Sequence, residues 1–190
     1  MKKISELIRP FICVILGALL LLFYLNWLAG SGVTLGIGIT AIVMAAYYLA
    51  VGILGVVLGD KMGGARKIID IISIVFFPLF MFVYFLLITI NAAQVMGPTG
   101  WTIAILSMIG ALAFPVFYVV SRFVNVKWLS RIAVLFGAIF ILVLITNVLF
   151  DTVGNPIVLG NINIIGLVIY AVYSYMLINA LFVPEKPSEE

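Results

Sequence analysis

The chain has 190 residues, of which 66% are hydrophobic and only 9% are charged, and its mean hydropathy is +1.37. Soluble globular domains carry about 25% charged residues, so this composition excludes a water-soluble fold. The formal net charge is +3, and the basic residues stand in short clusters between apolar runs. Such clusters are typical of membrane orientation and of contact with anionic lipids, so we expect no nucleic-acid partner.

Six apolar runs take up almost the whole chain, and each is near the roughly 20 residues that a helix needs to cross hydrocarbon. In chain order, we predict transmembrane helices at about residues 11–28, 35–59, 68–90, 101–120, 132–150 and 162–182. The runs are apolar on every face, whereas the strands of a membrane barrel alternate polar and apolar residues. The predicted fold is all-α: a polytopic integral membrane bundle in one domain, 1–183, followed by a short polar tail, 184–190.

The first run also has features of a cleaved signal peptide, because Lys2 and Lys3 precede it and the small residues 29–31 follow it. Its apolar stretch is longer than the 7 to 15 residues usual for a signal peptide. We therefore predict a retained helix.

The basic residues predict how the chain lies in the membrane. They occur before the first run, between the second and third, between the fourth and fifth, and after the sixth: Lys2, Lys3, Arg9, Lys61, Arg66, Lys67, Arg122, Lys127, Arg131 and Lys186. Segments rich in Lys and Arg stay on the cytoplasmic side. We predict a plasma-membrane protein with both termini in the cytoplasm. The connector residues are predicted to contact anionic inner-leaflet lipids: Lys61, Arg66, Lys67, Arg122, Lys127 and Arg131.

Few residues in the chain are suited to catalysis. The sequence has no His and one cysteine, Cys13, which excludes His-based metal sites, Ser-His dyads and thiolate clusters from this sequence. The one ionisable residue inside the predicted spans is Asp70, and Arg66 and Lys67 precede it at helical spacing. This spacing favours a structural ion pair over a catalytic carboxylate. We predict no enzymatic activity, no cofactor and no metal.

A stripe of mostly small residues lies along the second run, with its members three or four positions apart. Small residues let two membrane helices approach closely, and the last two members of the stripe form a GxxxG step. We predict a helix-packing seam, either within the chain or with another protein, made of Gly38, Ala41, Ala45, Tyr48, Gly52, Gly55 and Gly59.

The sixth run has the most polar face. Five residues fall within an arc of about 100° on a helix: Asn163, Gly166, Tyr170, Tyr173 and Ser174. One interpretation is a surface that binds or conducts a solute. The other, which we favour, is hydrogen bonding between helices.

Prolines at positions 78 and 115 interrupt the third and fourth runs. Because proline has no N–H, each leaves the carbonyl four residues earlier without its helical donor, at Ile74 and Ala111. We therefore predict a kink in each of these helices, with Ser73 and Ser107 available to offset the local polarity.

The sequence favours a non-enzymatic membrane protein that acts through helix packing, as an accessory or assembly subunit of a membrane complex. Its partners are then membrane lipids and other membrane-protein subunits or further copies of itself. The alternative is a small transporter component or channel for a neutral or weakly polar solute. A charged solute fits poorly, since the spans offer no counter-ion for it.

Overall fold

The computed structural model describes residues 2–30, 35–94, 97–124, 126–149 and 161–182. It is built from six α-helices and one short 3-10 helix, with no strand among the described residues. The elements are α1 (Lys2–Gly30), α2 (Leu35–Leu58), η1 (Gly59–Met62), α3 (Ala65–Ala92), α4 (Pro98–Phe123), α5 (Lys127–Leu149) and α6 (Asn161–Phe182). The prediction of an all-α bundle of six helices is confirmed. The predicted tail, 184–190, lies outside the described residues.

Five of the helices are long and apolar enough to cross a membrane. The qualifying segments are Ile8–Leu25, Ile39–Leu58, Ala65–Leu87, Pro98–Phe123 and Trp128–Thr146, and the described part of α6 adds a shorter apolar stretch, Gly166–Leu181. Large apolar side chains also cover the outside of the bundle; Val57 is 71% exposed and Leu142 is 63% exposed. An apolar exterior of this extent is what lipid contact requires. The chain is a polytopic integral membrane protein.

Local sequence explains several helix boundaries. Gly59 and Gly63 have positive φ angles of 48° and 51°, a conformation that glycine adopts without steric cost, and they form the turn from α2 to α3. Pro98 opens α4 directly after the extended Gly97, because the first helical position needs no N–H donor.

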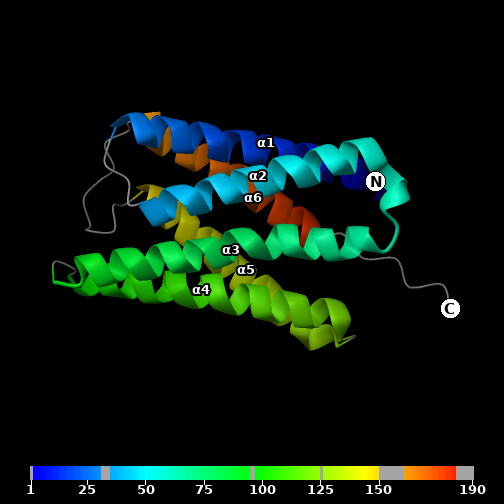
Figure 1. Ribbon diagram of the computed structural model, residues 1–190. Helices are drawn as coiled ribbons and strands as arrows, with labels where there is room; N and C mark the ends of the chain where they lie inside the picture. The colour runs from blue at the N-terminus through cyan, green and yellow to red at the C-terminus, as the bar shows by residue number, and fades with distance from the viewer. Residues whose placement is uncertain (1, 31–34, 95–96, 125, 150–160, 183–190) are drawn as a thin grey trace.

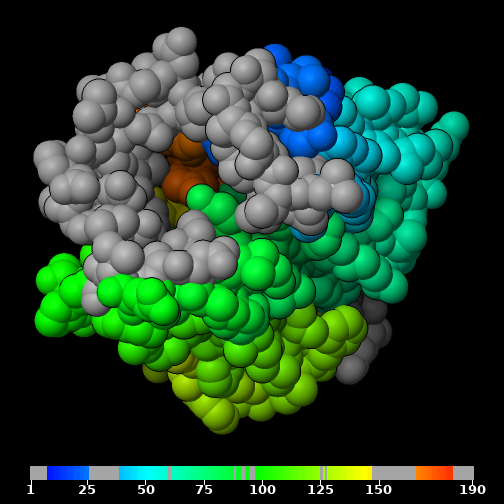
Figure 2. Space-filling view, turned by 60° about the vertical axis from the view of Figure 1, so that its left-hand side comes forward, coloured from blue at the N-terminus to red at the C-terminus, as the bar shows by residue number. Residues whose placement is uncertain are grey.

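Helices that follow one another in the chain contact each other, and α6 contacts both α5 and α1, so the six helices close into a ring. Figure 1 shows this bundle from the side. The closest pairs are α1 with α2 and α4 with its two neighbours α3 and α5, and α6 also touches α3 across the ring. In the space-filling view, the side chains of α3, α4 and α5 form one continuous surface, coloured green to yellow (Figure 2).

One end of the bundle collects the segments that carry basic residues. The start of α1, the turn from α2 to α3, the turn from α4 to α5 and the end of α6 all lie on the right of Figure 1. We call this the basic end. Lys186 lies outside the described residues.

The interior of the ring is filled with aromatic side chains. Five rings are less than 2% exposed: Tyr48, Phe77, Phe114, Phe140 and Tyr173. Two of them, Tyr48 of α2 and Tyr173 of α6, both form hydrogen bonds to α3.

Candidate functional site

The small-residue seam of α2 lies against α1. A Cβ atom at Gly52 would come within 2.7 Å of the Val14 backbone nitrogen and 2.8 Å of the Pro10 carbonyl oxygen, and one at Gly55 within 2.9 Å of the Pro10 ring. Contacts below 3.0 Å are not tolerated without a shift of one helix. The absent side chains therefore let α1 and α2 pack backbone against backbone.

The other seam residues occupy different environments. Ala41 and Ala45 are buried in the bundle, whereas Gly59 lies past the end of α2 in η1, where an added Cβ would meet nothing within 4 Å. The side-chain surroundings of Gly38 lie outside the described residues. α1 contributes its own small residue, Gly17, whose Cβ position is 2.7 Å from the Leu49 nitrogen. Sequence reasoning missed Gly17 because it stands alone in its run.

The predicted polar face of α6 divides into residues with different roles. Tyr173 is fully buried, and its hydroxyl donates a 2.6 Å hydrogen bond to the carbonyl oxygen of Ile74 on α3. Tyr170 is half-buried, with its ring edge against Phe77. Ser174 is half-buried, and an added Cβ at Gly166 would meet nothing within 4 Å. The fifth member, Asn163, is described in its backbone only.

The hydrogen bond from Tyr173 pairs the Ile74 carbonyl, which the sequence indicated would lack a helical donor. Pro78 lies inside α3 and has no N–H to donate to Ile74 four residues earlier. Tyr173 supplies the missing donor from the neighbouring helix. Its ring also stacks on Phe77, with 4.3 Å between the ring centroids.

A second tyrosine reaches the same turn of α3 from α2. The hydroxyl of Tyr48 donates a 2.7 Å hydrogen bond to the Ser73 carbonyl oxygen, one residue before Ile74. Tyr47 lies beside it, with its hydroxyl 3.2 Å from Ser73 Oγ. We call Tyr48, Tyr173, Ser73 and Ile74 the tyrosine clamp. Sequence reasoning placed Tyr48 in the seam and did not connect it with Pro78.

The serines near the prolines bond to their own helices. Ser73 Oγ donates to the Ile69 carbonyl, and Ser107 Oγ donates to the Ile103 carbonyl, both four residues back. This is the common way for a helix to pair a buried hydroxyl. The described residues contain no buried side-chain polar atom without a partner.

An ion pair joins α1 to α3 near the basic end. Arg9 Nη1 lies 3.1 Å from Asp70 Oδ2, and the two side chains are 23% and 34% exposed. The sequence pointed to Arg66 and Lys67 as the partners of Asp70, because only neighbours in sequence can be paired by spacing. Arg9 is 61 residues away, and only the tertiary fold brings its side chain to Asp70 of α3.

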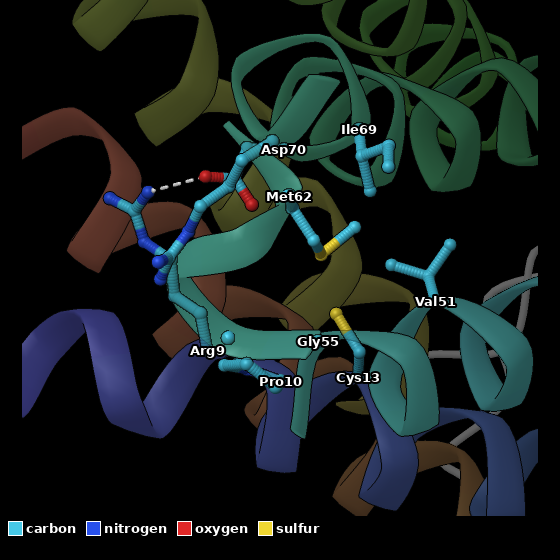
Figure 3. A pocket seen from close by; sticks show the side chains of 10 residues that line it. Arg9, Pro10, Cys13, Val51, Gly55, Met62, Ile69 and Asp70 are labelled. Carbon is cyan, nitrogen blue, oxygen red and sulfur yellow. Dashed lines mark hydrogen bonds and ion pairs between the residues drawn. The ribbon is translucent and has the colours of Figure 1, made fainter. Parts of the chain in front are cut away.

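A small crevice lies beside this ion pair (Figure 3). Its free volume is about 30 Å³, which is room for one or two water molecules. Four elements line it: Arg9, Pro10 and Cys13 of α1, Val51 and Gly55 of α2, Gly59 and Met62 of η1, and Arg66, Ile69 and Asp70 of α3. Charged groups and apolar groups share its walls.

The predicted lipid-contacting residues are placed at the basic end but are not equally exposed. Lys61 and Arg131 are exposed. Arg122 instead donates to the Ala180 carbonyl in the last turn of α6, and its guanidinium lies 4.9 Å from the ring centroid of Tyr118. A cation near the C-terminus of a helix also favours the helix dipole. Arg122 therefore joins α4 to α6.

Two further members of that set have different surroundings. Lys67 Nζ lies 5.9 Å from the ring centroid of Phe123 on α4, a separation at which an ammonium is attracted to an aromatic face. Lys127 is described in its backbone only.

Among the described residues, no three His, Cys, Asp or Glu side chains gather where they could hold a metal ion. No known protein family, curated protein or solved structure matches the chain.

Proposed function

We propose that the protein is a non-enzymatic accessory or assembly subunit of a membrane complex, inserted in the plasma membrane with both termini in the cytoplasm. The observation that carries this proposal is the tyrosine clamp. Tyr48 and Tyr173 are both 0% exposed, and the hydroxyl of each donates to the backbone of α3.

A binding or conducting surface presents its polar groups to a cavity. In this bundle, the two clamp hydroxyls point at carbonyl oxygens at hydrogen-bond distance, and the stacked ring of Phe77 fills the space between α3 and α6. These groups fix the positions of three helices relative to one another. A rigid bundle with an apolar exterior suits a subunit that supports other membrane proteins.

The surface available to a partner follows from the same packing. Gly52 and Gly55 of the α2 seam are covered by α1, so a partner subunit would contact the outer apolar faces of the helices or the basic end. Lys61 and Arg131 are exposed there, and so are the large rings of Phe123 and Trp128, at 68% and 58%. Aromatic rings beside cations are typical of the membrane interface.

Purification in mild detergent tests this proposal. We expect a second membrane protein to copurify in a fixed ratio, identified by mass spectrometry and removed by harsher detergent. Purification of the protein alone from its native membrane, at full yield and folded, would contradict a subunit role.

The second candidate is a small transporter component for a neutral or weakly polar solute, favoured by the crevice and ion pair at one end of a closed six-helix ring. Flux through vesicles that contain the purified protein separates the two candidates. A transporter would lose flux in the variants Tyr170→Phe and Asn163→Leu while staying folded. We expect no solute flux from the purified protein.

The proposed orientation can be tested by cysteine labelling in a Cys13→Ser background. A membrane-impermeant maleimide added from outside should label cysteines placed at the three connectors without basic residues, at Ser31, Thr99 and Thr152. It should not label cysteines at Gly64 or Asn125. The reverse pattern would place the termini outside the cell.

A further inference from the structure

We propose that the mouth of the crevice at the basic end binds the headgroup phosphate of an anionic phospholipid, with the phosphate against the Arg9 and Arg66 side chains and not within the enclosed space of about 30 Å³. The site uses Arg9, which the sequence analysis did not include among the lipid contacts, together with Arg66. It depends on insertion of the chain in a membrane and not on the proposed role as a subunit.

The charge of the crevice matches a single anion. Two guanidinium groups, Arg9 and Arg66, and one carboxylate, Asp70, line it, which leaves a net charge of +1. A guanidinium carries five N–H donors, and the contact of Arg9 with Asp70 is made through Nη1. Asp70 thereby holds the Arg9 side chain at the crevice, and further donors of Arg9 can point to a phosphate oxygen. Paired donors of this kind recognise phosphate better than a lysine ammonium does.

The depth of the crevice suits a lipid headgroup. The apolar segments of α1 and α3 begin at Ile8 and Ala65, so Arg9, Arg66 and Asp70 all lie in the first two turns of a span. A helix rises 1.5 Å per residue, which places Asp70 roughly 7 Å inside the start of the α3 segment. Phospholipid phosphates lie at about this boundary between headgroups and hydrocarbon.

The surface beside the crevice suits the acyl chains of the same lipid. Leu54 and Leu58 of α2 are 47% and 40% exposed, and they follow the crevice residues Val51 and Gly55 by three positions, which places them on the adjoining face of α2. α2 and α3 also approach each other less closely than α1 and α2 do. The crevice thus combines a cationic mouth with apolar flanks, as a phospholipid requires and a soluble anion does not.

The binding of phosphatidylglycerol to the full-length protein in detergent, followed by native mass spectrometry, tests the proposal. We expect one molecule of this lipid to bind more tightly than phosphatidylcholine, because the zwitterionic lipid does not match a net positive site. Arg66→Gln should weaken binding of phosphatidylglycerol about tenfold, the effect of one charge-assisted hydrogen bond.

Arg131→Gln is the matched control, since it removes the same charge at the same end of the bundle from an exposed residue outside the crevice. We expect little change in this variant. An equal loss in both variants would mean that general surface charge attracts the lipid and would overturn the proposal. Equal binding of phosphatidylcholine and phosphatidylglycerol would also overturn it.

Two further measurements keep the test decisive. The melting temperature of each variant in phosphatidylcholine vesicles shows whether it is folded, and Arg66→Lys, which keeps the charge, should retain part of the affinity if Arg66→Gln is unstable. Inorganic phosphate is the second probe. Displacement of the lipid by millimolar phosphate, or equally tight binding of phosphate alone, would assign the crevice to a soluble anion and refute the lipid assignment.

Discussion

The tyrosine clamp predicts an order of stabilities for three Tyr→Phe variants. Tyr173→Phe removes only the hydroxyl that donates to Ile74, and the ring that stacks on Phe77 at 4.3 Å stays. The carbonyl of Ile74 then has neither its cross-helix donor nor a helical one, because residue 78 is proline. This should be the most costly of the three changes.

The magnitude follows from the environment of the bond. Hydrogen bonds between membrane helices contribute about 0.6 kcal/mol on average and up to about 1.7 kcal/mol, and a buried acceptor left unpaired costs about 1–3 kcal/mol. Since Tyr173 is 0% exposed, we expect Tyr173→Phe to lower the free energy of unfolding by about 1.5 kcal/mol. Tyr48→Phe should cost about 0.6 kcal/mol, because the helical amide of Phe77 remains near the Ser73 carbonyl.

Tyr170→Phe is the control on the same helix. Its ring is half-buried beside Phe77, and no hydrogen bond of its hydroxyl is found within the described residues, so the change should be close to neutral. Unfolding in mixed micelles of mild detergent and dodecyl sulfate measures all three variants. Equal stability of Tyr173→Phe and Tyr170→Phe would show that the hydrogen bond from Tyr173 to the Ile74 carbonyl does not stabilise the fold. It would refute the stabilising role of the tyrosine clamp.

Three other contacts between helices can be tested in the same assay. Gly52→Ile should push α1 from α2 and destabilise the bundle by more than about 3 kcal/mol, since overpacking by even one or two methylenes costs about 1–3 kcal/mol; Ile53→Leu, at an exposed position, should be neutral, and equal tolerance of both would refute the seam. A double-mutant cycle of Arg9→Gln and Asp70→Asn should give a coupling of about 1 kcal/mol, between the values for exposed and buried pairs, and additive effects would mean that the pair does not stabilise the fold. Arg122→Gln should cost about 1–2 kcal/mol, because it removes a charged donor to the end of α6, and an unchanged stability would show that this contact is dispensable.

The amino-acid sequence by itself determined the class of the protein and the course of its chain. Runs of about 20 apolar residues can satisfy their backbone groups in lipid only as helices, so the six helices follow from composition and length. The helix boundaries differ from the predicted spans mainly where helices extend past the hydrocarbon core. α1, for example, begins at Lys2 and not near residue 11, because hydropathy marks the apolar part of a helix and not its ends.

The sequence also indicated which residues would avoid lipid, because periodicity places residues on one face of a helix. It predicted that the small residues of α2 and the tyrosines of α6 face other helices, and that Pro78 leaves one carbonyl without its helical donor. Periodicity is a property of one helix, however, and contains no information about the helix that faces it.

Only the tertiary structure decided the partners. It placed α1 over Gly52, Tyr173 on Ile74, and Arg9 beside Asp70, and each of these contacts joins residues far apart in the chain. The physical reason is that apolar helices in lipid gain little from hydrophobic burial against one another. Their pairing is therefore set by close backbone approach, ring stacking and a few hydrogen bonds, all of which require the faces of two helices to fit together.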